Sequence, residues 1–164
     1  MLVVDDNKVI RQLIRVNLEL EGFEVVTAAD GAECLDVVHQ VRPDAITLDV
    51  VMPRLDGLRT AARLRADPRT RDLPLAIVSA CTQYEVDSGL ETGVDAFLAK
   101  PFDPAELVSL VRQLIGRERS GERNRERSRE RRGDPEHGVE DAGADEVVFG
   151  SVFGAGEAAG RTGG

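Results

Sequence analysis

The sequence is poor in lysine and aromatic residues, and it has no long apolar run. Lys8 and Lys100 are the only lysines among 21 basic residues, and the chain has no tryptophan and one tyrosine. No apolar run approaches the roughly 20 residues of a membrane-spanning helix. The N-terminus lacks the pattern of a secretion signal. We therefore expect no membrane contact. Cys34 and Cys81 follow no metal or redox spacing, which favours free thiols in a reducing cytoplasm.

Composition divides the 164 residues into two parts. Residues 1–115 hold nearly all of the core-forming side chains and carry 12 basic and 19 acidic residues, a net charge of −7. The rest holds 11 of the 16 glycines and little apolar material. We expect a folded domain over 1–115 and a charged, Gly-rich, disordered tail over 116–164. The acidic domain argues against nucleic-acid binding.

Strand-like and helix-like patterns alternate five times along residues 1–115. Short apolar runs typical of buried strands lie at 2–5, 23–27, 44–49, 74–79 and 95–99. Amphipathic or helix-compatible segments follow them at 7–20, 31–41, 56–66, 84–92 and from Pro104 onward. This alternation predicts an α/β fold, a five-stranded parallel sheet with helices on both faces. Right-handed crossovers leave few strand orders, among them the flavodoxin-like order 2-1-3-4-5.

Polar side chains of matching chemistry follow four of the predicted strands. Asp5 and Asp6 follow the first strand, and Asp49 follows the third. Ser79 follows the fourth strand and Lys100 follows the fifth. With the order 2-1-3-4-5, ligands bind beyond the carboxyl ends of the first and third strands, where the strand order reverses. The carboxylates therefore gather where the fold predicts a binding crevice. Together with a hydroxyl and an ammonium group, they are what a metal-assisted phosphoryl site needs.

Residues 2–115 resemble the receiver domain of two-component response regulators, of the stand-alone, chemotaxis-regulator type. Four short motifs carry the resemblance, and they occur in order with 43 residues from Asp6 to Asp49, 30 from there to Ser79 and 21 from there to Lys100. No single motif is specific, but the ordered set is. The motifs are Val3-Val4-Asp5-Asp6-Asn7, Asp49 with Met52-Pro53 and Gly57, Ser79-Ala80, and Lys100-Pro101-Phe102.

The resemblance implies that Asp49 accepts a phosphoryl group. The donor would be a histidine kinase or a histidine phosphotransfer protein, and the product an aspartyl phosphate. Asp6, Asp49 and the backbone carbonyl of Val51 would ligate Mg²⁺, and Asp5 would hold the ion mainly through water. A hard divalent cation removes the repulsion between an attacking carboxylate and the phosphoryl group.

The resemblance also implies roles for three residues at the ends of the fourth and fifth strands. Lys100 would neutralise the charge on the phosphoryl oxygens, and a cis peptide bond before Pro101 would aim it into the site. Ser79 would donate its hydroxyl to the transferred group, and Phe97 would turn inward behind it as part of the switch.

The implied function is a phosphorylation-controlled signalling switch of a two-component system or phosphorelay. Phosphorylation would alter the binding of a target protein at the face formed by the fourth helix, fifth strand and fifth helix. The domain would not be an enzyme in the usual sense, because it would catalyse only its own Mg²⁺-dependent phosphotransfer and slow dephosphorylation. Two alternatives stay open, a phosphorylation-independent interaction module and a nucleic-acid-binding regulator acting through the Arg-rich residues 117–132.

Each site residue also has a purely structural interpretation. Asp6 could cap the following helix, Asp49 could be a turn residue, and Lys100-Pro101 could form a surface turn. In the tail, like charges recur at i,i+4 in residues 117–132, so we expect at most a marginal helix there. The apolar residues near the end, Val147-Val148-Phe149 with Val152-Phe153, could form a short docking motif.

Overall fold

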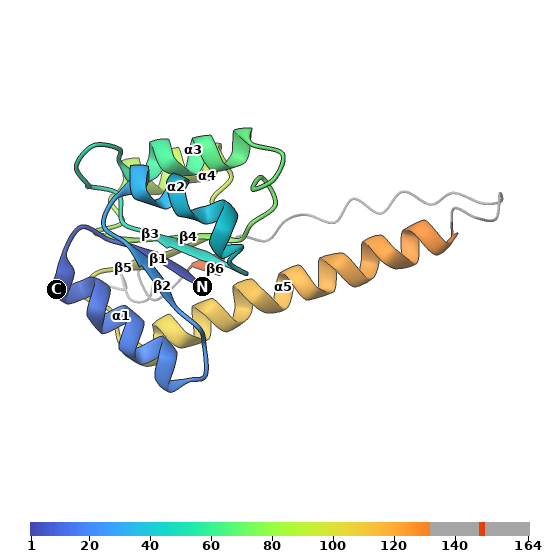
Figure 1. Ribbon diagram of the computed structural model, residues 1–164, viewed down its shortest axis with the longest axis horizontal. Helices are drawn as coiled ribbons and strands as arrows, with labels where there is room; N and C mark the ends of the chain where they lie inside the picture. The colour runs from blue at the N-terminus through green and yellow to red at the C-terminus, as the bar shows by residue number, and fades with distance from the viewer. Residues whose placement is uncertain (132–147, 150–164) are drawn as a thin grey trace, which may run out of the picture.

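The computed structural model describes residues 1–131 and 148–149 and contains a parallel sheet with helices on both faces (Figure 1). The sheet runs in the order β2-β1-β3-β4-β5, as predicted, and a two-residue strand β6 follows β5. The strands are β1 (Leu2–Val4), β2 (Val26–Ala28), β3 (Ile46–Leu48), β4 (Leu75–Ser79), β5 (Ala96–Ala99) and β6 (Val148–Phe149). The helices are α1 (Lys8–Leu20), α2 (Gly31–Val41), α3 (Gly57–Ala66), α4 (Gln83–Thr92) and α5 (Pro104–Arg131).

Two apolar clusters cover the two faces of the sheet. One joins strand residues to α2, α3 and α4, with Cys34, Leu64 and Val86 as members. The other joins the opposite side chains of the strands to α1 and α5, through residues such as Leu18 and Leu107. The central strands β1, β3 and β4 are buried along their whole length. Burial on both faces explains why they appear in the sequence as continuous apolar runs rather than alternating ones.

The first helix begins immediately after the acidic pair of β1. Asn7 is its N-cap, and its side-chain oxygen accepts hydrogen bonds from the backbone N–H groups of Val9 and Ile10 at 2.9 and 3.1 Å. The interpretation of Asp6 as the helix cap is therefore wrong. Because Asn7 satisfies the exposed N–H groups of the first turn, Asp6 is left available for other interactions.

The fifth helix is longer than expected. Residues 116–131 continue α5 through Gly116 and Gly121 to Arg131, and the last turns extend beyond the sheet in Figure 1. We expected at most a marginal helix over 117–132 within a disordered tail, and residues 117–131 are helical in the structure. Extension of an existing helix adds a hydrogen bond for each residue that is fixed, whereas a separate helix must first be nucleated. The packed turns around Leu107 and Val111 supply that start.

The sixth strand was not predicted. Val148 and Phe149 pair in parallel with Ala96 and Phe97 of β5. Part of the apolar cluster that could form a docking motif therefore lies on the edge of the sheet. Residues 132–147 and 150–164, which include the rest of the predicted tail, lie outside the described part of the chain. The domain boundary at residue 115 stays a prediction.

None of the described helices has the length and apolarity to cross a membrane.

Candidate functional site

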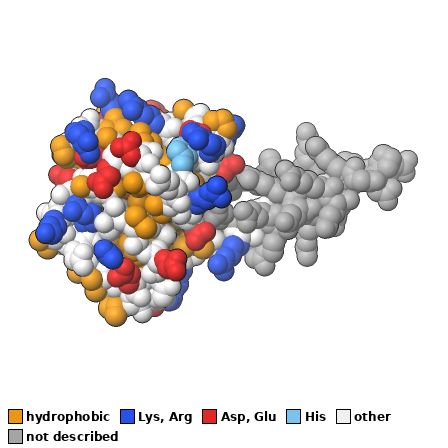
Figure 2. Space-filling model, in the orientation of Figure 1, with side chains coloured by type: hydrophobic (Ala, Val, Ile, Leu, Met, Phe, Trp, Pro, Cys, Tyr) orange, Lys and Arg blue, Asp and Glu red, His pale blue; other side chains and the backbone are white. Residues whose placement is uncertain are grey.

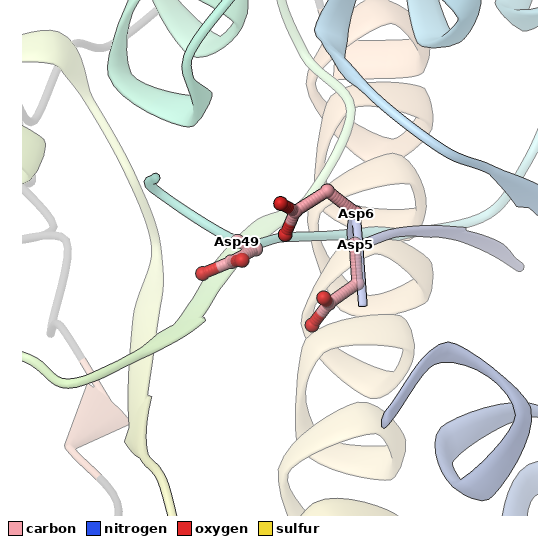
Figure 3. A group of neighbouring side chains, drawn as sticks. All are labelled: Asp5, Asp6 and Asp49. Atoms are coloured by element: carbon pink, nitrogen blue, oxygen red, sulfur yellow. The ribbon is translucent and has the colours of Figure 1, made fainter. Parts of the chain in front are cut away.

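Three carboxylates meet at the carboxyl ends of β1 and β3 (Figure 3). Asp5 and Asp6 directly follow β1, and Asp49 directly follows β3, the neighbouring strand. Each contributes a carboxylate oxygen, and these oxygens all lie within 4.8 Å of one another. Asp5 and Asp49 are buried, whereas Asp6 is exposed. The structure thus brings together the acidic residues that the sequence placed at one edge of the sheet.

Lys100 enters this cluster from the end of β5. Its Nζ donates a hydrogen bond to Asp5 Oδ2 at 2.7 Å and lies 3.5 Å from Asp49 Oδ1. The peptide bond between Lys100 and Pro101 is cis, as expected. The two distances place the compact ammonium group between carboxylates that follow different strands. The interpretation of Lys100-Pro101 as only a surface turn does not account for these contacts.

Asp49 lies in a strongly perturbed environment. Burial, followed by the negative charge of Asp5, raises the pKa of Asp49 from 3.8 to about 6, although the Lys100 charge acts in the opposite direction. The backbone N–H of Val50 donates to Asp49 Oδ1 at 2.8 Å and also lowers this pKa. The Lys100 ammonium group therefore does not fully offset the combined effect of burial and the Asp5 charge on this pKa. A further cation would stabilise the ionised form of Asp49.

The donor set fits a hard divalent cation. Carboxylate oxygens are the ligands that Mg²⁺ prefers, and Mg²⁺ usually keeps several waters. Both oxygens of Asp5 already accept hydrogen bonds, from Lys100 and from the backbone N–H of Asn7 at 2.9 Å. This arrangement favours contact between Asp5 and an ion through water. Val51, whose backbone carbonyl we expect to be a ligand, lies in the β3–α3 loop two residues after Asp49 and is 76% exposed.

Ser79 ends β4 beside the strand that carries Lys100. Its backbone carbonyl accepts a hydrogen bond from the Lys100 N–H at 2.7 Å. Its buried hydroxyl donates to Glu85 Oε2 at 3.0 Å and accepts from the Cys81 N–H at 3.1 Å. Cys81 lies in the short connection between β4 and α4 and has a left-handed backbone with a φ of 52°.

Sequence reasoning missed Glu85. The pattern Thr82-x-x-Glu85 is a capping box, which could have been found and which predicts a helix start here. In the structure Thr82 N–H donates to Glu85 Oε2 at 2.9 Å, and Glu85 N–H donates to Thr82 Oγ1 at 3.3 Å. The sequence carries no local signal for the additional contact with Ser79.

Phe97, the second expected switch residue, lies inside the domain. It is only 1% exposed, and its ring lies against Gly89 of α4. Phe97 therefore packs directly against α4, which lies on the same face of the sheet.

The chain belongs to the response regulator receiver domain family, whose model matches residues 1–112. It is 42% identical over 123 residues to the response regulator MprA of a Mycobacterium species, a match that covers 74% of this chain and 53% of MprA. It is 38% identical over 118 residues to RpaA of Synechocystis, described as a DNA-binding dual master transcriptional regulator, covering 71% of this chain and 49% of RpaA. The chain thus spans about half the length of these curated relatives.

One of the solved structures with a similar fold contains a metal ion. The receiver domain of the sensor histidine kinase PA1611 from Pseudomonas aeruginosa has a magnesium ion coordinated in its active site cleft. It matches with a TM-score of 0.66 and 34% identity, covering 70% of this chain and 95% of that one. The resemblance stated from the motifs is confirmed, and so is the fold class.

Proposed function

We propose that this chain is a phosphorylation-controlled signalling switch whose acceptor is Asp49. The observation that carries the proposal is the meeting of Asp49 with Asp5, Asp6 and Lys100 at the carboxyl edge of the sheet. The donor is a histidine kinase or a histidine phosphotransfer protein. In the transfer, an Asp49 carboxylate oxygen bonds to phosphorus as the phosphorus–nitrogen bond of the donor histidine breaks. The released imidazole takes up a proton from water.

Asp6, Asp49 and the backbone carbonyl of Val51 would hold Mg²⁺, with Asp5 acting mainly through water. When bound, the ion would supply positive charge that lets two negatively charged groups approach. The cluster of carboxylate oxygens and the high pKa of Asp49 support this assignment. The magnesium ion in the PA1611 receiver domain is a further argument for it.

Lys100 would stabilise the charge that develops on the phosphoryl oxygens. Its ammonium group is held by Asp5 at 2.7 Å and lies 3.5 Å from Asp49, so little reorganisation is needed when the new charge appears. Ser79 would donate its hydroxyl to the transferred group, and Phe97 would report the change to α4. The activity would be limited to this self-catalysed transfer and to slow dephosphorylation.

The output would be altered binding of a protein at the face formed by α4, β5 and α5. The burial of Phe97 of β5 against Gly89 of α4 supports this choice of face, because it joins two of the elements that form it. We place the switch in the cytoplasm, in keeping with the free thiols of Cys34 and Cys81.

A nucleic-acid-binding function remains the second candidate, because RpaA is described as DNA-binding. The face of the described domain in Figure 2 shows Lys and Arg interspersed with Asp and Glu rather than gathered by sign. Nucleic-acid binding usually requires a basic patch or stripe. The Arg-rich residues 117–131 of α5 are the segment that we would test first for such binding.

The test is labelling with a small phosphodonor. The protein is incubated with acetyl phosphate and Mg²⁺, and the intact mass is measured. We expect one added phosphoryl group in the parent and none in Asp49→Asn, whose side chain has the same shape but does not act as a nucleophile here. An Asp44→Asn variant, changed at an exposed carboxylate outside the cluster, should be labelled like the parent. Undiminished labelling of Asp49→Asn would move the acceptor to another residue.

A further inference from the structure

The Ser79 hydroxyl is committed to a buried glutamate of α4. Ser79 is 2% exposed and Glu85 is 6% exposed, and the hydroxyl donates to Glu85 Oε2 at 3.0 Å. A serine hydroxyl has one proton to donate. Two acceptors lie within reach of that proton, Glu85 Oε2 at 3.0 Å and the weaker acceptor Cys81 Sγ at 3.9 Å. The nearer, charged carboxylate is the stronger acceptor, so the proton is committed to Glu85 rather than to a phosphoryl group on Asp49.

Glu85 is itself fixed to the first turn of α4. The same Oε2 atom accepts from Thr82 N–H at 2.9 Å, and the capping box with Thr82 holds the glutamate backbone in place. The Cys81 N–H in turn donates to the Ser79 hydroxyl at 3.1 Å. These hydrogen bonds connect the end of β4 to the start of α4 through two side chains.

We infer that Glu85 is a positioning residue that holds Ser79 in the unphosphorylated arrangement and couples its release to α4. This inference rests on the proposed function. Phosphorylation would change the acceptor of one hydrogen bond. The Ser79 O–H group would turn from Glu85 and donate to a phosphoryl oxygen instead. Glu85 would keep the Thr82 N–H but lose a partner inside the protein. Since a buried carboxylate with fewer hydrogen bonds is costly, the first turn of α4 would shift to expose it.

The coupling has a direction that can be measured. A charged acceptor binds a hydroxyl more strongly than a neutral one, so Glu85 favours the unphosphorylated state. Glu85→Gln keeps the side-chain length and can still form a capping box, but it weakens the contact with Ser79. A weaker contact raises the fraction of protein that is competent to bind a phosphoryl group, and the apparent affinity rises with that fraction.

The experiment titrates the protein with beryllium trifluoride in the presence of Mg²⁺, as a non-covalent mimic of a phosphoryl group on Asp49. Binding is followed by the NMR signals of the Cys81 and Thr82 N–H groups, which donate to Ser79 and Glu85. We expect Glu85→Gln to lower the half-saturating concentration about fivefold, the difference between a charged and a neutral acceptor. Glu91→Gln, an exposed glutamate on the same helix, should leave it unchanged.

Two further variants separate the contact from other effects of Glu85. In a Ser79→Ala background, Glu85→Gln should change the half-saturating concentration less than about twofold, because coupled residues lose their mutual effect when either is removed. An equal gain in that background would show that Glu85 acts by charge repulsion and would overturn the inference. Thr82→Ala removes the cap hydroxyl but leaves the Ser79–Glu85 contact, and it should not reproduce the fivefold gain.

The outcomes distinguish this inference from the proposed function. If the parent binds the mimic and is labelled on Asp49 but Glu85→Gln behaves like the parent, the role of Glu85 is wrong and the switch stands. If the parent neither binds the mimic nor takes label, the proposed function fails and the role of Glu85 fails with it.

Discussion

The ring of Phe97 lies so close to Gly89 that a larger residue at position 89 would collide with it. A Cβ built on Gly89 would fall 2.7 Å from Cε1 of the ring. Gly89 is buried within α4, and Phe97 is 1% exposed on β5. The glycine therefore permits the close packing of α4 against the strand that carries the expected switch aromatic.

This contact predicts the effect of Gly89→Ala. An alanine normally stabilises a helix interior by about 1 kcal/mol relative to glycine. Here the added methyl group must displace the Phe97 ring or α4, and overpacking of this kind costs about 1–3 kcal/mol. We expect a net loss of stability in urea unfolding. The matched control is Gly116→Ala in α5, where an added Cβ meets nothing within 4 Å. This substitution should stabilise the protein. A Gly89→Ala protein as stable as the control variant would contradict the packing argument.

The raised pKa of Asp49 predicts how stability depends on pH without divalent cations. The folded-state pKa of about 6 lies above the usual 3.8, so the folded protein binds the proton more tightly than the unfolded chain. This group therefore destabilises the fold as pH rises from about 4 to 6, and the full cost is present above pH 6.

Asp49→Asn removes this cost. In EDTA at pH 7 we expect the variant to be more stable than the parent by on the order of 2 kcal/mol. The difference should shrink as pH falls through 6 and vanish near pH 4. Urea unfolding of both proteins across this range checks the prediction, and a pH-independent difference would contradict it.

Mg²⁺ should stabilise the protein by binding the folded state. At tenfold excess over its dissociation constant, a ligand of this kind adds about 1.4 kcal/mol. Asp6→Ala should lose this response, since it removes one carboxylate of the cluster. Asp36→Ala, which changes an exposed carboxylate of α2 outside the cluster, should retain it. The measurement is the melting temperature with and without Mg²⁺, and an intact response in Asp6→Ala would exclude Asp6 as a ligand.

The extended α5 predicts the effect of truncation. A chain ending at residue 115 should melt within a few degrees of a chain ending at residue 131, because Leu114 is the last buried residue among the α5 side chains that the structure describes. Its far-UV circular dichroism should show less helix than a chain ending at residue 131. Salt-dependent DNA or RNA binding that the longer chain shows and the shorter one lacks would instead favour a nucleic-acid function for α5.

Sequence reasoning located the site because the fold places strand ends together. Asp5, Asp49 and Lys100 each directly follow an apolar run, so knowledge of the strand order was enough to bring them to one edge. The role of Asn7 as the helix cap, in place of Asp6, depends on a one-residue difference that the pattern does not resolve.

The features that were missed depend on contacts between distant elements. Glu85 reaches Ser79 only because the chain turns at Cys81, whose positive φ is uncommon for a residue with a side chain. The pairing of Val148 with Ala96 joins segments about fifty residues apart, and no local pattern encodes it. The continuation of α5 beyond Gly116 depends on the packed turns before it rather than on its own composition.

The last prediction concerns the lifetime of the phosphorylated state. Hydrolysis of an aspartyl phosphate requires a water positioned in line with the bond to phosphorus. Val51 and Cys81, two residues beyond Asp49 and Ser79, offer no carboxamide or carboxylate to hold such a water. We therefore expect a long-lived phosphorylated state in the absence of a phosphatase.

Val51→Asn tests this explanation directly. Val51 is 76% exposed, so the substitution should not disturb the core. The side-chain amide of the new asparagine can orient the attacking water. We expect the label to decay several-fold faster, since a positioned polar group of this kind contributes substantially to such reactions. Val51→Ile is the matched control, because it changes size without adding a hydrogen-bonding group, and it should decay like the parent. Decay of the phosphoryl label is followed by intact mass at fixed Mg²⁺. If Val51→Asn loses its label no faster than Val51→Ile, water positioning at this residue does not determine the lifetime.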